Sequence, residues 1–166
     1  MFTNAPRQPV WPLPSLTGRL PIALTTDPKT AGLELAYADM VVPDMTPAFA
    51  VGDGVITYAG KQLHGYAVVI DHKNGWASYY ANLEHMFALP TNRGARARVE
   101  RVKTSDVIGF VGAAMPDAPR CLHFELWRLG PHGHYEPTDA LAIMRSWLIV
   151  PWRNERVSVS RMQATA

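Results

Sequence analysis

Cysteine is almost absent from this sequence, since Cys121 is the only one in 166 residues. A lone cysteine excludes an internal disulfide framework and leaves the redox compartment undetermined. Charged residues are also scarce, at 18%, and the formal net charge is only +2. This composition gives no reason to expect a nucleic-acid partner.

Long apolar runs are missing as well. Prolines interrupt the N-terminal residues throughout, and no basic start precedes an unbroken apolar stretch. The sequence therefore predicts neither a secretory signal peptide nor a membrane span. If the protein meets a bacterial envelope, we expect another component to deliver it.

What the chain does contain is enough apolar residues, 48%, to bury one core of ordinary size. Six of the fourteen prolines lie within residues 1–30, which predicts an extended arm. We expect a single domain over residues 31–150, followed by a polar tail over residues 151–166. Neither an internal repeat nor a low-complexity block is present.

A short cationic stretch leads into the second half of the domain. Such a stretch can face phosphates or anionic wall polymers, but its glycine and asparagine favour a solvated loop. The cations are Arg93, Arg96, Arg98, Arg101 and Lys103.

Short runs with period-2 alternation or β-branched residues, separated by glycines, dominate residues 40–128, and they predict an all-β core. These runs are 47–51, 54–60, 65–72, 75–83, 105–112 and 121–130. Asn74-Gly75 predicts a hairpin between 65–72 and 75–83, because both residues tolerate positive φ. His64 and His72 then lie at hairpin ends, where we expect surface residues. Residues 137–148 predict one short helix.

Four ordered blocks between about residues 35 and 140 resemble the lysostaphin-type, or LytM-like, zinc endopeptidases. The blocks are DMVVPDMTPAFAVGDGVITYAG, GYAVVIDHKNGWASYYANLEHM, VKTSDVIGFVG and CLHFELW. The resemblance implies an antiparallel sheet of the lysostaphin type, an open, barrel-like sandwich similar to a duplicated hybrid motif. It also implies a groove in which zinc is held by the His and Asp of HxGxD and by the second His of HLH.

Two of the five functional positions of that pattern survive here. Asp39 and His123 match two zinc ligands, whereas Leu35 occupies the third ligand position and has no lone pair to donate. Asn82 replaces the histidine of YxHL, and Cys121 replaces the first histidine of HLH. We therefore expect a degenerate member of the family, because losing an acid–base group costs on the order of 10² to 10⁴ in rate.

The possible ligand sets for zinc depend on which residues share one face of a strand. Alternation places Cys121, His123 and Glu125 on one face of their strand. A Cys121 thiolate could ligate zinc beside His123, with Asp39 or Glu34, so an active enzyme with atypical ligands is the alternative. The structural alternative is that His123 lies in the wall of the groove and forms a hydrogen bond to a neighbouring residue instead of binding metal. The residues expected to line the groove are Tyr37, Trp76, Tyr80, Asn82, Cys121 and Glu125.

The expected function is therefore recognition or assembly by an inactive or vestigial peptidase domain. No cofactor is expected, although zinc is possible. The expected partner is a peptidoglycan stem peptide or another protein. A second hypothesis is a structural role in a phage tail, virion or injection assembly, with the protein in a phage particle or in the cytoplasm.

Overall fold

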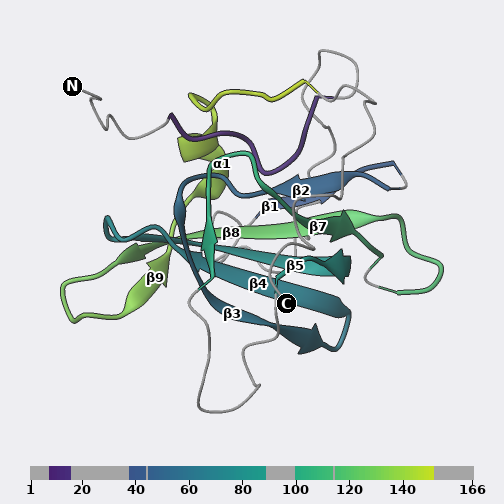
Figure 1. The fold of residues 1–166 in the computed structure, drawn as a ribbon, viewed down its shortest axis with the longest axis horizontal. Helices are drawn as coiled ribbons and strands as arrows, with labels where there is room; N and C mark the ends of the chain where they lie inside the picture. Colours follow the sequence, from purple (N-terminus) through teal and green to yellow (C-terminus); the bar gives the residue numbers. More distant parts are fainter. Residues whose placement is uncertain (1–7, 16–37, 44, 89–99, 114, 152–166) are drawn as a thin grey trace, which may run out of the picture.

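The computed structural model describes residues 8–15, 38–43, 45–88, 100–113 and 115–151 (Figure 1). Within these ranges the chain forms nine strands and one short helix. The elements are β1 (Ala38–Val41), β2 (Pro47–Phe49), β3 (Gly54–Gln62), β4 (Gly65–Asp71), β5 (Trp76–Met86), β6 (Arg101–Val102), β7 (Val107–Val111), β8 (Cys121–Leu129), β9 (Tyr135–Pro137) and α1 (Ala140–Met144).

The strands form one open antiparallel sheet with the order β1-β8-β5-β4-β3-β6. β9 pairs with β8, and β7 pairs with both β5 and β2. Figure 1 shows α1 and residues 8–15 on the side of the sheet where β2 also lies. The expected all-β fold, with an unclosed sheet and a short C-terminal helix, is confirmed.

The expected hairpin between β4 and β5 is confirmed. The His72 N–H donates to the Trp76 carbonyl over 2.9 Å, which closes the turn. Positive φ falls on Lys73 and Gly75, at 61° and 82°, and not on Asn74. Asn74 contributes differently, because its Oδ1 accepts a hydrogen bond from the Trp76 N–H at 3.2 Å.

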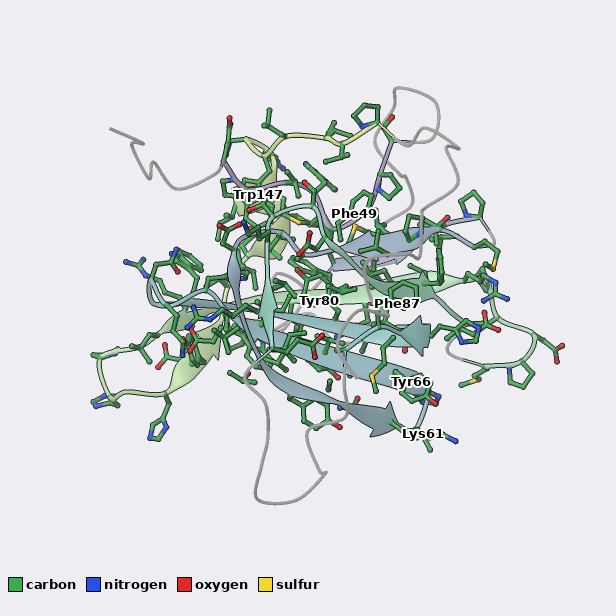
Figure 2. The ribbon with its side chains drawn as sticks, in the orientation of Figure 1. Phe49, Lys61, Tyr66, Tyr80, Phe87 and Trp147 are labelled. Atoms are coloured by element: carbon green, nitrogen blue, oxygen red, sulfur yellow. The ribbon has the colours of Figure 1, made fainter. Side chains whose placement is uncertain are left out.

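Strict alternation along β8 builds the centre of the core. Leu122, Phe124 and Leu126 are buried, whereas the residues between them are only partly buried. Tyr80 of β5 meets Phe124 edge-on, with ring centroids 5.2 Å apart, and Figure 2 shows Tyr80 near the middle of the molecule. One face of β8 is therefore core, as the sequence predicts.

A buried hydrogen-bonded chain ties this core to the hairpin. Tyr80 Oη accepts from the Val51 N–H at 2.9 Å and lies 3.2 Å from Ser78 Oγ. Ser78 Oγ in turn lies 2.9 Å from His72 Nε2. The opposite ring nitrogen of His72 bonds the Asp53 carbonyl. His64 is exposed, as the sequence predicts, whereas His72 is only partly exposed.

The described part of the N-terminal arm packs against the domain. Val10, Trp11 and Leu13 are buried, and the Phe49 N–H donates to the Pro12 carbonyl over 2.8 Å. Isolated bridges join the arm to the residues after α1, at Val10–Leu148 and Ser15–Pro151. The rest of the predicted arm and of the predicted tail lies outside the described residues.

Helix α1 is shorter than the twelve residues that the sequence predicts. Asp139 caps its start by accepting from the Ala142 N–H at 2.9 Å. The helix ends at Met144, which is fully buried. In the described part of the chain, no helix has the length and apolar character needed to span a membrane.

Replacing Tyr80 with phenylalanine tests the buried chain. We expect the free energy of unfolding to fall by about 1–3 kcal/mol, because the buried Val51 N–H loses its acceptor. Urea unfolding followed by circular dichroism measures the change. The matched control is Tyr135→Phe, which removes a hydroxyl whose bond to Asp71 is exposed, and which we expect to change stability by under about 0.5 kcal/mol. Equal losses in the two variants would contradict this account.

Candidate functional site

Antiparallel pairing brings the two retained ligand positions together. Asp39 of β1 lies directly opposite His123 of β8, and its Oδ1 is 2.7 Å from His123 Nδ1. Directly opposed residues of paired strands project to the same face of the sheet. Two residues 84 positions apart in sequence therefore form one ion pair on the face opposite the core.

The far side of the His123 ring meets a second carboxylate. Glu125 Oε1 lies 2.9 Å from His123 Nε2, and Glu125 Oε2 accepts from the Trp127 indole N–H at 2.5 Å. All three side chains belong to the same face of β8, because they are two residues apart. The ring of His123 is thus held between two carboxylates, one of which is itself fixed by Trp127.

This arrangement favours a protonated histidine. Burial by itself lowers the pKa of His123, but the hydrogen bonds and charges of Asp39 and Glu125 outweigh it and raise the pKa to about 9. Burial raises the pKa of Glu125, and the bonds from His123 and Trp127 bring it below its ordinary value. At neutral pH the site therefore holds an imidazolium between two carboxylates.

The donors present do not make a complete zinc site. A zinc-bound histidine ligates through one nitrogen and donates its other N–H to a carboxylate, which is how Glu125 meets Nε2 here. A catalytic zinc nevertheless needs three protein ligands. Among the described residues, no group of three or more His, Cys, Asp or Glu side chains could hold a metal. Leu35, Tyr37 and Glu34 lie outside the described residues.

Cys121 does not supply the missing ligand. It shares the face of His123, but it pairs with Val41 and not with Asp39. Burial first, and then the negative charge of Asp39, raises the pKa of its thiol to about 11. In the part of the chain that the structure describes, no group of three or more His, Cys, Asp or Glu side chains could hold a metal, so the structure does not assemble the atypical set of Asp39, Cys121 and His123.

The groove face of β5 differs from the one that the sequence predicts. Tyr79 and Ala81 oppose Glu125 and His123, so they face the groove. Tyr80 is fully buried in the core, and Trp76 lies on the core side of the sheet beside Leu126. The prediction that Trp76 and Tyr80 line the groove is wrong, because the period-2 pattern of β5 was assigned to the wrong face.

Asn82 reaches the groove through a β-bulge. Tyr66 opposes Leu83 and Val68 opposes Tyr80, so Ala81 and Asn82 together face one residue of β4. Asn82 adopts a φ of 60°, and Leu83 returns to the core. An extra residue of this kind re-aims a side chain toward a site. The amide of Asn82 therefore lines the groove, although the regular alternation would have buried it.

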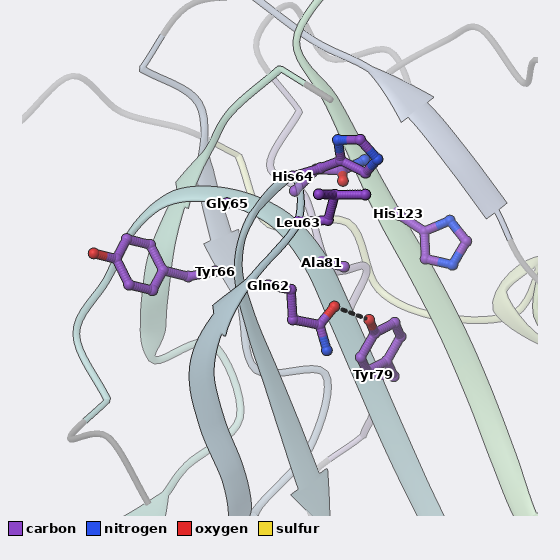
Figure 3. A pocket seen from close by; sticks show the side chains of 9 residues that line it. Gln62, Leu63, His64, Gly65, Tyr66, Tyr79, Ala81 and His123 are labelled. Carbon is purple, nitrogen blue, oxygen red and sulfur yellow. Dashed lines mark hydrogen bonds between the residues drawn. The ribbon is translucent and has the colours of Figure 1, made fainter. Parts of the chain in front are cut away.

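A pocket of about 310 Å³ lies where the groove meets the turn between β3 and β4 (Figure 3). Tyr79 forms its floor, donating from its hydroxyl to Gln62 Oε1 over 2.8 Å. Tyr79 also stacks on Trp127, with centroids 5.5 Å apart, and meets His123 edge-on at 6.0 Å. The lining residues are Gln62, Leu63, His64, Gly65, Tyr66, Tyr79, Ala81, Asn82 and His123.

Sequence reasoning missed Tyr79, Trp127 and Gln62. Trp127 could have been found, because it continues the alternation of His123 and Glu125 along β8. Tyr79 and Gln62 could not, since their positions follow from strand pairing. Together these side chains offer a flat aromatic surface and amide groups beside a pocket of about 310 Å³. They also lie beside the ionic triad formed by Asp39, His123 and Glu125.

Comparisons with known proteins find relatives of this chain. The model of Peptidase family M23 matches residues 37–137. DD-carboxypeptidase/endopeptidase Mpg of Neisseria meningitidis serogroup B is 36% identical over 99 residues, which cover 59% of this chain and 18% of that protein. The chain thus spans less than a fifth of the length of that relative.

Solved structures show the same fold. A protein of Ruminococcus gnavus, proposed to be the glycyl-glycine endopeptidase lytM, matches with a TM-score of 0.63 and 16% identity, covering 88% of this chain and 64% of that one. The solution structure of lysostaphin matches with a TM-score of 0.57 and 17% identity, covering 81% and 56%. At this identity the likeness concerns the fold alone.

The charge on His123 gives a test of the ionic triad. In chelator-treated protein, we expect the pKa of His123 to lie near 9 and to fall toward 6.5 in Asp39→Asn, because the neutral amide no longer stabilises the imidazolium. Titration of the imidazole C–H signals by NMR measures both values. The control variant is Asp117→Asn, which changes an exposed carboxylate away from the site.

The same shift predicts how stability depends on pH. A pKa raised in the folded state stabilises the protein fully below the unfolded value of 6.5, and this stabilisation is lost as the pH rises through about 9. Asp39→Asn should flatten that decline. A native pKa close to 6.5 would contradict the carboxylate–imidazolium arrangement.

Proposed function

Because this chain belongs to Peptidase family M23, we propose that it is a member that uses its groove to recognise peptide and no longer hydrolyses it. The proposed ligand is a stem peptide of peptidoglycan. We propose a peptide ligand because proteins similar to this chain are named as endopeptidases. The groove supplies the means of binding.

The observation that carries the proposal is the incomplete ligand set. Asp39 and His123 lie together, but among the described residues they belong to no group of three or more His, Cys, Asp or Glu side chains that could hold a metal. If zinc were bound, it would supply a Lewis acid and an activated water. Asp39 and His123 would be two of its ligands, but the sequence puts an apolar side chain at Leu35. We therefore derive no hydrolytic step through a metal.

The groove also lacks the acid–base histidine of the YxHL pattern. Asn82 lines the groove where the family pattern has a histidine. An amide neither accepts nor releases a proton at neutral pH, so Asn82 cannot serve as a general acid or base. It can, however, donate to and accept from a peptide bond.

Peptide recognition suits the groups that remain. Gln62 and Asn82 contribute amides to the lining of the pocket, and Tyr79 stacks on Trp127. Aromatic side chains supply apolar contact area, while amides fix the orientation of a polar backbone. A role in a virion or tail assembly gains no support from the described contacts, so we do not propose it.

Retention on purified peptidoglycan tests the groove. We expect the unmodified chain to be retained and Tyr79→Ala to lose at least about tenfold in apparent affinity, because the aromatic floor is removed. Co-sedimentation at several peptidoglycan concentrations measures this. Tyr135→Ala is the matched control, since Tyr135 is exposed on β9 and lines neither the groove nor its pocket. Equal retention of Tyr79→Ala and the unmodified chain would count against the groove.

Zinc content tests the loss of hydrolysis. We expect protein purified without added zinc to carry far less than one zinc per chain, and to release no dye from labelled peptidoglycan, because only two ligands are retained. Elemental analysis and dye release measure these quantities. Stoichiometric zinc together with chelator-sensitive release would overturn the proposal.

A variant that rebuilds the family pattern provides the matched gain-of-function control. It combines Leu35→His, Asn82→His and Cys121→His with Tyr37→Gly, because the resemblance puts Tyr37 at the glycine position of HxGxD. We expect this variant to bind zinc more tightly than the unmodified chain, because a third ligand is restored. Dye release that appears only in the rebuilt variant would locate the loss in these positions.

A further inference from the structure

A second pocket, of about 430 Å³, lies on the face of the sheet opposite the groove. Trp76 and Leu126 line it from β5 and β8, on the side to which Tyr80 and Phe124 also project. Its volume is in the range of sites that bind small molecules. The lining residues are Pro9, Val51, Gly52, Asp53, His72, Asn74, Trp76, Leu126, Ile143 and Trp147.

Segments far apart in the sequence build the walls of this pocket. The arm contributes Pro9, the hairpin contributes Trp76, and the end of α1 with the following turn contributes Ile143 and Trp147. Figure 2 shows Trp147 beside α1, on the side where the arm crosses the sheet. Two indole rings and several aliphatic side chains therefore enclose a space that the groove does not share.

The polar groups of the pocket are well fixed. His72 bonds through both ring nitrogens, to the Asp53 carbonyl and to Ser78, and burial lowers its pKa so that it stays neutral. Asp53 Oδ1 accepts from the N–H and the hydroxyl of Thr104 at 2.7 and 2.9 Å. The Asn74 side chain accepts from the Trp76 N–H, which holds its amide at the edge of the pocket.

Two opposite charges constrain what the pocket can accept. Asp53 is a carboxylate in the lining, and it disfavours an anionic ligand. The guanidinium of Arg128 lies over the Trp76 ring, 5.5 Å from its centroid, so a cation–π contact is already made there and a cationic ligand is disfavoured. Within the described part of the chain, neither indole N–H donates a hydrogen bond to another residue.

We propose that this pocket is a saccharide site that binds a neutral pyranose ring. The C–H face of such a ring packs on an indole, and its hydroxyls accept from indole N–H groups and exchange hydrogen bonds with the Asn74 amide. A purely apolar ligand would leave these polar groups unused. The site lies outside the groove, so the proposal goes beyond peptide recognition and does not depend on it.

Titration with saccharides in NMR tests this site. The probes are N-acetylglucosamine, its β-1,4-linked trimer and methyl glucoside, added to the full chain. We expect at least one to bind with a Kd of about 1 mM or tighter, and to shift the indole N–H signals of Trp76 and Trp147. We expect Trp147→Ala to raise that Kd by about tenfold or more. Asn74→Ala provides a second variant in the exposed turn, with a smaller expected loss.

The groove variant Tyr79→Ala is the matched control, and we expect it to leave saccharide binding unchanged. This comparison separates the two proposals, because failure of peptidoglycan retention does not affect saccharide binding to the pocket. Absence of binding by all three probes would overturn the saccharide site. Shifts confined to Tyr79 and His123, or stronger binding of acetate or tetramethylammonium than of the sugars, would overturn it as well.

Discussion

The pairing of β8 between β1 and β5 is the constraint on which both faces of this protein depend. β8 alternates without interruption through its first six residues, so each odd position projects to one face and each even position to the other. His123 and Glu125 thereby reach the groove, while Phe124 and Leu126 enter the core. Moving the register by one residue would bury the ions and expose the apolar side chains. The ionic triad and the core are therefore fixed by the same hydrogen-bonded ladder.

The buried chain of hydroxyl groups gives the hairpin a fixed relation to that core. The Val51 N–H and the Ser78 hydroxyl both donate to Tyr80, Ser78 Oγ lies 2.9 Å from His72 Nε2, and the other ring nitrogen of His72 lies 2.9 Å from the Asp53 carbonyl. Each buried polar atom of the chain has a partner, which avoids the cost of an unsatisfied group. His72 in turn lines the second pocket. Burial lowers the pKa of His72, which favours the neutral ring in that pocket.

Local patterns in the sequence were sufficient for the elements whose signals are local. The turn at Asn74-Gly75 and the alternation of β8 depend on neighbouring residues, and both were predictable. The groove face of β5 was not, because Ala77, Ser78, Tyr80 and Ala81 are all buried and leave no period-2 contrast. The bulge at Asn82 then reverses the parity of the strand. A short sequence does not reveal such an insertion, since it is defined by the partner strand.

The second pocket shows the same limit over a longer range. Pro9, Trp76 and Trp147 come from the beginning, middle and end of the chain, and no spacing rule relates them. The sequence predicts a helix over residues 137–148, and this prediction gives no sign that Trp147 lines a cavity. Sites formed by distant segments become visible only when the packing of those segments is known.

The ionic triad explains how a metal site can lose a ligand without loss of the fold. In a complete zinc site, the carboxylate on the second ring nitrogen orients the histidine and makes it a better ligand. Here Glu125 makes the same contact, and Asp39 lies against the other ring nitrogen. The positive charge then resides on the ring, and the two carboxylates remain paired. Because each of the three charged side chains has a partner, substitution of the third ligand need not destabilise the groove. We propose that the groove serves binding in the absence of hydrolysis.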